Sequence, residues 1–319
     1  MRCILFVLAA GLGLVAIAAQ AAGLRTVEVP ADADGPALRV QVWSPCAMPP
    51  EETRLGPLLL PAVRGCPVLG DQLPLIVISH GHGGGYLSHH DTAEALADAG
   101  FVVAALNHPG DNFADMSRAD DIATMFERPT DIRRLIDFML GAFPDAARID
   151  PRRIGLFGFS RGGYTGLVIA GARPDFHDAR VPCPEPAPIC GQIRRNEIPT
   201  GPLTRDPRVK AAVIVDPLSF FPTTDSLRAV TIPVQLWGSQ FGGDGVLPDS
   251  VAALARTLPD PPEFHLVANA GHFSFLAPCP PAWAKAQPEI CADPAGFDRA
   301  AFHRDFDAQI LAFFRAHVV

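Results

Sequence analysis

Lysine is nearly absent from this 319-residue chain: only Lys210 and Lys285 occur, and there is no run of five like charges. Arginine carries almost all of the positive charge, and 34 acidic residues against 26 basic ones give a formal net charge of -8. Nucleic-acid binding needs a basic stripe that neutralises phosphates, whereas this sequence has only short pairs such as Arg152-Arg153. The composition therefore argues against a nucleic-acid partner.

Charged residues of both signs are also few, at 19% of the chain against 48% hydrophobic residues. A chain with this much apolar surface can bury enough of it to offset the conformational entropy lost on folding, which excludes a disordered protein. The length would allow two domains, although α/β folds often use this many residues in one. We expect a single domain over residues 22–319, preceded by a signal peptide over residues 1–21.

The N-terminal residues have the features of a secretory signal peptide. Arg2 supplies a positive start, Ile4–Ala18 is an unbroken apolar or small run, and Ala19-Gln20-Ala21 fits the small-x-small cleavage pattern. A membrane anchor is the alternative, but the run is short for a span of about 20 residues and no basic stop-transfer cluster follows it. We therefore expect cleavage after Ala21, no membrane span in the remaining chain, and an exported protein that is periplasmic or secreted.

Six of the seven cysteines remain after such a cleavage, and no pair has the C-x-x-C spacing of a zinc or redox site. Exported proteins meet oxidising conditions, in which disulfides are favoured over free thiols. Six cysteines allow 15 connectivities, among which the sequence does not choose rigorously. Because they fall into three local pairs around proline-rich loops, we expect the bridges Cys46–Cys66, Cys183–Cys190 and Cys279–Cys291.

The pattern of apolar residues predicts an α/β protein. Two alternating segments, Arg25–Val29 and Leu38–Trp43, predict an antiparallel hairpin at the sheet edge. Six later runs are short and continuously apolar, as in strands that helices bury on both faces. These runs are Leu75–Ser79, Phe101–Leu106, Ile154–Phe159, Ala211–Val215, Val234–Trp237 and Phe264–Val267.

Segments with helical periodicity alternate with these strands. They are Thr92–Ala99, Ile132–Leu140 behind a cap candidate at Thr130, Gly163–Ala172, Ser250–Leu258 and Phe297–His317. Strand–helix alternation of this kind predicts a mostly parallel central sheet with helices on both faces.

One segment, Arg173–Arg208, interrupts the alternation with eight prolines and two cysteines in 36 residues. Proline at that density argues against a regular helix or a central strand. Loops this long inside a compact domain are usually functional or disordered. We interpret the segment as an ordered, lid-like insertion over one edge of the site, with a surface loop of no special function as the alternative.

The pentapeptide Gly158-Phe159-Ser160-Arg161-Gly162 is a G-x-S-x-G sequence between a predicted strand and a predicted helix. This strand–turn–helix setting is that of a nucleophile elbow, in which the serine has a strained backbone and the two glycines leave room for it. The hydroxyl then lies at a helix N-terminus, which favours developing negative charge. Ser160 is our candidate nucleophile, and a role as a helix cap is the alternative.

A serine hydroxyl is a weak nucleophile without a base beside it. His272 follows the last predicted strand on a glycine-containing loop, and the carboxyl ends of parallel strands meet at one edge of the sheet, where Ser160 also emerges. Two aspartates could orient its imidazole: Asp244, after the strand Val234–Trp237, and Asp216, at the end of the strand before. We prefer Asp244, because a glycine-rich turn aims a short carboxylate well, and keep Asp216 as the alternative.

A histidine- and glycine-rich loop, Ser79–Gly85, follows the first buried strand. Glycines let a backbone approach a tetrahedral oxyanion closely, and we assign the backbone N–H groups of His82 and Arg161 as the oxyanion hole. Metal binding by the local histidines is the alternative; they are His80, His82, His89 and His90. Glycines stand where an H-x-H-x-D-H site needs Asp and His, and no H-E-x-x-H occurs. The expected chemistry needs neither a cofactor nor a metal.

Four blocks of sequence together resemble those of α/β-hydrolases: Ser160 in its pentapeptide, His80–Gly85, Asn107–Asp111 and Ala270–Phe273. More narrowly, the chain is similar to bacterial proteins described as dienelactone-hydrolase-like or platelet-activating-factor-acetylhydrolase-like. The resemblance covers the chain from Leu75 to the C-terminus. It implies the α/β-hydrolase fold and a serine esterase with a Ser–Asp–His triad.

The sequence departs from these families in informative ways. Dienelactone hydrolases have a cysteine at the position of Ser160, so their substrate is not carried over. Acetylhydrolases place the acid after the preceding strand, which points to Asp216. The wider superfamily places it in a D-x-x-x-P turn, which matches Asp244 and Pro248.

The sequence thus predicts an exported serine hydrolase that cleaves small-molecule or lipid-like carboxylic esters through an acyl-serine intermediate. An amidase or peptidase that uses the same triad is one alternative, and a non-catalytic binding protein on a hydrolase fold is another. The acyl group, the alcohol and the oligomeric state are not specified by the sequence.

Overall fold

The computed structural model describes residues 21–181, 183 and 187–319. The predicted signal peptide lies outside these residues apart from Ala21, which begins the first strand and is buried. Cleavage after Ala21 therefore stays a prediction.

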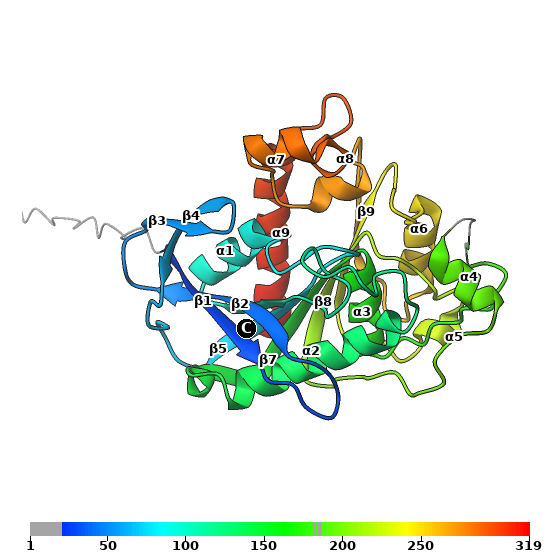
Figure 1. The fold of residues 1–319 in the computed structure, drawn as a ribbon, viewed down its shortest axis with the longest axis horizontal. Coiled ribbons are helices and arrows are strands. Elements are labelled where there is room, and N and C mark those ends of the chain that lie inside the picture. Colours follow the sequence, from blue (N-terminus) through cyan, green and yellow to red (C-terminus); the bar gives the residue numbers. More distant parts are fainter. Residues whose placement is uncertain (1–20, 182, 184–186) are drawn as a thin grey trace, which may run out of the picture.

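Ten strands form one sheet in the order β10-β9-β8-β7-β5-β6-β2-β1-β4-β3 (Figure 1). The strands are β1 (Ala21–Val29), β2 (Leu38–Cys46), β3 (Glu52–Leu55), β4 (Leu58–Arg64), β5 (Leu73–Ser79), β6 (Val102–Leu106), β7 (Ile149–Phe159), β8 (Val209–Val215), β9 (Val234–Ser239) and β10 (Glu263–Val267). From β6 to β10 the neighbours are parallel, and β2 joins β6 and β1 in antiparallel pairs. The predicted fold class is confirmed.

Helices cover both faces of this sheet (Figure 1). They are α1 (His90–Asp98), α2 (Thr124–Gly141), α3 (Arg161–Ala170), α4 (Pro188–Arg194), α5 (Thr224–Leu227), α6 (Pro248–Thr257), α7 (Pro281–Ala286), α8 (Pro288–Cys291) and α9 (Arg299–Val318), with short 3-10 turns η1 (Ala146–Arg148) and η2 (His272–Phe275). Side chains alternate along β5: Leu75 and Val77 belong to the core cluster that includes residues of α2, α3 and α6, while Ile76 and Ile78 belong to the cluster that includes residues of α1 and α9. The central strands are apolar throughout because both of their faces are covered.

Two local predictions need correction. The hairpin β3–β4 was not predicted, and it lies outside β1 and β2, so β3 is the outermost strand on that side. Helix α2 begins at Thr124 and runs through Pro129, so Thr130 is inside the helix and does not cap it. Met125 and Arg128 are buried in the first turns of α2, and their packing keeps the residues before Pro129 helical.

The described part of the proline-rich insertion contains one short helix, which its composition argued against. Helix α4 starts with Pro188 in its first turn, where a proline ring is tolerated because that N–H has no intrahelical partner. Ile189 and Ile193 are buried, and Gln192 Nε2 donates to the carbonyl of Asp120 at 2.6 Å. The insertion therefore packs against the loop between β6 and α2, while a function as a lid stays a prediction.

All three predicted disulfides are present, with Cα–Cα distances of 5.9 Å for Cys46–Cys66, 5.3 Å for Cys183–Cys190 and 5.8 Å for Cys279–Cys291. Three bridges are compatible with an exported protein, since disulfides persist in oxidising compartments. Within the residues that the structure describes, every helix is too short or too polar to cross a bilayer.

Candidate active site

Ser160 lies in the sharp turn between β7 and α3, as its sequence context predicts. Its backbone angles are φ 57° and ψ −118°, outside the regions that L-residues ordinarily adopt. Hydrogen bonds fix the turn: the N–H of Ser160 donates to the carbonyl of Val215 at 2.9 Å, and its own carbonyl accepts from Gly163 at 2.9 Å. A strained serine held by its surroundings is typical of functional sites.

The two glycines of the pentapeptide are required by close backbone contacts. A Cβ at Gly162 would lie 1.9 Å from the carbonyl oxygen of Ser79, and one at Gly158 would lie 2.2 Å from the carbonyl oxygen of Gly162. Both distances are far below van der Waals contact. The elbow therefore excludes any other residue at these two positions.

His272 and Asp216 form a buried pair beside this turn. His272 Nδ1 lies 2.7 Å from Asp216 Oδ2, and the side chains of both residues are almost completely inaccessible to solvent. The imidazole stacks on the ring of Phe159, the residue before Ser160, with centroids 4.6 Å apart. His272 Nε2 is buried and has no hydrogen-bond partner among the described residues, so it is free to accept a proton from a hydroxyl.

The carboxylate of Asp216 is held on three sides. Oδ1 accepts from the backbone N–H of Ser239 at 2.8 Å, and Oδ2 accepts from the Ser239 hydroxyl at 2.8 Å as well as facing His272. The same hydroxyl accepts from the N–H of Gly242, whose carbonyl accepts from the N–H of His272. Asp216 is thus fixed in an orientation that holds the imidazole.

The structure brings Asp216 against His272, whereas we preferred Asp244 from the sequence. Asp244 is exposed in a tight turn in which Gly243 and Val246 exchange backbone hydrogen bonds. The turn brings Gly243 against the Cβ of His272, but it leaves the Asp244 carboxylate pointing to solvent rather than to the ring. Asp216, the alternative acid, lies beside His272 Nδ1, where we expected Asp244 to lie.

The two N–H groups assigned to an oxyanion hole lie on segments that meet at Ser160. Arg161 is the first residue of α3, so its N–H has no intrahelical partner. The loop that carries His82 reaches the serine, because a Cβ at Gly81 would lie 3.1 Å from the Cβ of Ser160. Burial and the nearby charge of Arg161 lower the pKa of the His82 side chain.

Two of the four histidines considered as metal ligands, His80 and His89, have other roles among the described residues. His80 is buried, with Nδ1 2.6 Å from the carbonyl oxygen of Gly81 and with Nε2 accepting from the N–H of His108 at 3.1 Å. The ring of His89 packs on Phe157 and Phe159. Burial lowers the pKa of both His80 and His89 to about 3. Both are therefore neutral core residues at pH 7.

One group of possible metal ligands was not predicted from the sequence. Within the described part of the chain, ligand atoms of Asp91, His303 and Asp307 lie within 4.8 Å of one another. The two nitrogens of His303 already have partners: Nδ1 lies 2.6 Å from Asp91 Oδ2, and Nε2 lies 3.0 Å from the carbonyl oxygen of Ser274. A protonated imidazole satisfies this arrangement, in agreement with the raised pKa that hydrogen bonding to Asp91 gives His303.

Exposed apolar side chains lie on two loops that contact the segments of the site, and we call this region its mouth. Phe113 and Met116, on the loop after β6, lie against Gly85 and Gly83 of the histidine- and glycine-rich loop. Phe241 and Leu247 are on the loop after β9 that contacts His272. Acidic side chains border the same region: those of Asp120 and Asp244 are exposed, and Asp120 lies 3.9 Å from His82 Nε2.

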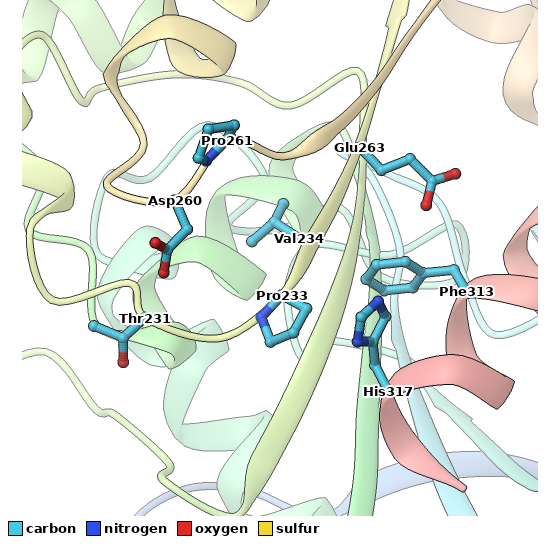
Figure 2. A pocket seen from close by; sticks show the side chains of 8 residues that line it. All are labelled: Thr231, Pro233, Val234, Asp260, Pro261, Glu263, Phe313 and His317. Carbon is cyan, nitrogen blue, oxygen red and sulfur yellow. The ribbon is translucent and has the colours of Figure 1, made fainter.

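A hollow of about 370 Å³, whose lining side chains are drawn in Figure 2, lies at the amino ends of β9 and β10. Its lining includes Val234 and Glu263, the first residues of β9 and β10, and His317 from α9. Ligands of open parallel sheets bind outside the carboxyl ends of the strands, where Ser160 lies. The hollow is therefore separate from the candidate active site.

Comparison with solved structures places this architecture among known folds. A ferulic acid esterase from Streptomyces cinnamoneus superposes with a TM-score of 0.64, covering 95% of this chain and 91% of the esterase, at 20% sequence identity. The chain has the α/β-hydrolase fold. A dienelactone hydrolase from Anabaena variabilis has the same fold, with a TM-score of 0.54, coverage of 93% and 99% and 15% identity.

Two further similarities are with esterases. A cold-adapted esterase from an Arctic intertidal metagenomic library matches this chain with a TM-score of 0.50 and 16% identity, covering 84% of this chain and 91% of that one. By sequence, the curated protein "Putative esterase NocK" of Nocardia uniformis subsp. tsuyamanensis is 31% identical over 150 residues. That match covers 45% of this chain and 41% of the curated relative. No protein-family model matches the chain.

Proposed function

We propose that this α/β-hydrolase cleaves carboxylic esters through a covalent acyl-serine intermediate. Ser160 Oγ attacks the ester carbonyl while His272 Nε2 takes its proton, and the backbone N–H groups of His82 and Arg161 donate to the resulting oxyanion. As the alcohol leaves, His272 returns the proton to it. A water molecule then attacks the acyl group in the same way and releases the acid.

The pairing of His272 with Asp216 beside a strained serine is the observation that carries this proposal. The three residues are far apart in the sequence, yet Asp216 Oδ2 lies 2.7 Å from His272 Nδ1, and the imidazole stacks on Phe159. A carboxylate in this position keeps the proton on Nδ1, which leaves Nε2 as the base, and it stabilises the imidazolium that forms. The similarity to proteins named as esterases supports the same chemistry.

The mouth of the site favours uncharged, apolar esters. The apolar side chains at the entrance are those of Phe113, Met116, Phe241 and Leu247. Exposed apolar side chains gathered at one place mark binding surfaces, whereas the carboxylates of Asp120 and Asp244 repel substrates with a negative charge. The predicted signal peptide and the three disulfides support activity outside the cytoplasm.

Replacing Ser160 by alanine tests the proposal. Purified wild type should hydrolyse a short p-nitrophenyl ester and be labelled by a fluorophosphonate probe, and Ser160→Ala should do neither while its thermal unfolding stays unchanged. Ser250→Ala, on the partly exposed helix α6, is the matched control and should keep both properties. An unchanged rate in Ser160→Ala would refute the assignment of the nucleophile.

A matched ester and amide pair separates the esterase from the amidase alternative. An amine is a poorer leaving group and needs stronger protonation, so we expect the ester to be cleaved far faster than its amide analogue. A faster reaction of the amide would replace the esterase proposal. Lack of both hydrolysis and labelling in the wild type would favour a binding protein on a hydrolase fold.

A further inference from the structure

A buried cluster of three charged side chains joins the segments that carry the two candidate oxyanion N–H groups. It consists of Asp111, Arg128 and Arg161, and each of these residues is at most 5% exposed to solvent. Asp111 Oδ2 accepts from Arg128 Nε at 3.0 Å and from Arg161 Nη1 at 2.8 Å. We call this group the Asp111 cluster.

The Asp111 cluster holds the histidine- and glycine-rich loop on both sides of His82. Asp111 Oδ1 accepts from the backbone N–H of Gly83 at 3.0 Å. Arg128 donates from Nη1 to the carbonyl of His80 at 2.7 Å and from Nη2 to the carbonyl of Gly81 at 3.1 Å. These contacts fix the peptide groups that flank His82, and with them the direction of its N–H.

The same carboxylate holds the second N–H group. Arg161 is both the first residue of α3 and a member of the cluster, because its side chain turns back to Asp111. Its Nη1 also donates to the carbonyl of Ala119 at 2.6 Å, in the loop before α2. A shift of Asp111 would therefore move the segments of His82 and Arg161 relative to each other.

We propose that Asp111 is a positioning residue that sets the distance and direction of the two oxyanion N–H groups. It does not contact the substrate and acts only through Gly83, Arg128 and Arg161. Hydrogen-bond donors stabilise an oxyanion only when they are held 2.7–3.1 Å from where it forms, so a small displacement costs rate rather than substrate binding. The inference rests on the proposed ester hydrolysis and adds a residue to it.

The charge of the cluster supports the same role. Two guanidinium groups and one carboxylate leave one net positive charge in a region without solvent. The neighbouring imidazoles add no charge at pH 7, because burial and Arg128 hold the pKa of His80 and His108 well below the usual range. Burial raises the pKa of Asp131 to about 7, so at pH 7 this carboxyl group, 3.7 Å from Arg134, only partly offsets the positive charge of that arginine. A fixed positive charge in a low-dielectric region favours the negatively charged transition state.

Asp111→Asn tests the proposal, since it keeps the shape and places an amide NH2 or a neutral oxygen against the two guanidinium groups. We expect kcat and kcat/KM for a short p-nitrophenyl ester to fall together by about 10- to 100-fold, the pattern of an interaction made only in the transition state. The inhibition constant of an alkyl boronic acid, which forms a tetrahedral adduct with the serine, should rise by the same factor. If Asp111 had only a structural role, the folded variant molecules would have the kcat and the boronic acid inhibition constant of the wild type.

Asp206→Asn is the matched control. Asp206 is also a buried aspartate paired with an arginine, Arg208, but it lies before β8 at the opposite end of the sheet from Ser160. It should lower the unfolding temperature and leave kcat and the boronic acid inhibition constant within about twofold of the wild type. If Asp111→Asn does not fold, the same measurements on Arg161→Met decide, because this variant keeps the backbone N–H and loses the contact with Asp111.

The two failures are distinguishable. A wild type without hydrolysis or fluorophosphonate labelling would remove the proposed function itself. An active wild type with a folded Asp111→Asn variant within about twofold of it in kcat and in boronic acid inhibition would overturn the role of Asp111 alone. A loss of kcat without any weakening of boronic acid binding would overturn it as well.

Discussion

Replacing Asp216 by asparagine removes the charge of the candidate acid with almost no change of shape. In the structure, Oδ1 accepts from the backbone N–H of Ser239, while Oδ2 faces the Ser239 hydroxyl and His272 Nδ1. Because a backbone N–H needs an acceptor, the amide oxygen of the variant takes the Oδ1 position and its NH2 faces His272. The imidazole must then accept on Nδ1 and carry its proton on Nε2, where it is no longer a base for Ser160.

The wrong tautomer predicts a large loss. A carboxylate-to-amide change of this kind in a serine triad lowers kcat by about 10⁴-fold, which corresponds to about 5 kcal/mol of transition-state stabilisation. Asp244→Asn is the matched control, because Asp244 is exposed and has no contact with the imidazole. We expect it to stay within about twofold of the wild type on a neutral ester.

Steady-state hydrolysis of a short p-nitrophenyl ester and the rate of fluorophosphonate labelling measure both variants, with thermal unfolding as the check that each is folded. If Asp216→Asn kept kcat within tenfold of the wild type while Asp244→Asn lost activity, the reasoning from the 2.7 Å contact would be wrong. Asp244 would then be the acid, and the loop after β9 would have to rearrange before the reaction.

Three further predictions concern stability and specificity. Burial holds the pKa of His89 at about 3, below its value of about 6.5 when unfolded, so the unfolded chain takes up the proton first and stability falls as the pH drops from about 6.5 toward 3. Urea titrations at pH 7 and pH 4 measure how much the free energy of unfolding falls between these two pH values. We expect this fall to be smaller in His89→Phe than in the wild type, by up to about 3 kcal/mol. An equal fall in both proteins would contradict this account. Replacing Cys46 and Cys66 by alanine should lower the free energy of unfolding by about 3 kcal/mol with kcat unchanged, because the bridge restricts the unfolded chain by closing a loop of about 20 residues. A cost near zero would contradict this reason. A p-nitrophenyl ester whose acyl chain ends in a carboxylate should have a lower kcat/KM than a neutral ester of equal length. Replacing Asp120 and Asp244 by asparagine should bring the two kcat/KM values closer together. Equal kcat/KM values for the two esters in the wild type would show that these carboxylates do not repel a charged substrate.

Local patterns predicted most of the fold and the turn that carries Ser160. Each of the six short apolar runs after residue 70 became a strand of the sheet, and the pentapeptide around Ser160 forms the expected strained turn, because these features depend on neighbouring residues alone. The disulfides were predictable for the same reason, since each bridge closes a short loop. The hairpin β3–β4 was missed although its signal is present: Leu58, Leu60 and Ala62 alternate on the buried face after a glycine turn.

The choice of the acid depended on information that local patterns lack. Asp216 and Asp244 both follow strands next to each other in the sheet, and both have a positive φ, of 42° and 46°. The difference lies in the direction of each side chain, which the Ser239 contacts decide for Asp216 and the tight turn at Gly243 decides for Asp244.

The Asp111 cluster was also beyond sequence reasoning. An arginine within a helix is ordinarily exposed, so nothing in the periodicity of α2 marks Arg128 as a fully buried residue. Its burial follows from carbonyl groups of a distant loop that need donors. Asp111 was noticed only as part of the block Asn107–Asp111 in the resemblance to α/β-hydrolases.

The position of α4 has a consequence for protein engineering. Gln192 of this helix is bonded to the backbone of Asp120 and Ile122, and between β6 and α2 the adjoining Ala119 accepts from Arg161. If the proposed ester hydrolysis is correct, exchanging residues 173–208 for the corresponding segment of a protein with the same fold should therefore alter turnover. A chimera that keeps these contacts would have to exchange residues 173–208 together with the segment around Asp120 and Ile122 that Gln192 contacts.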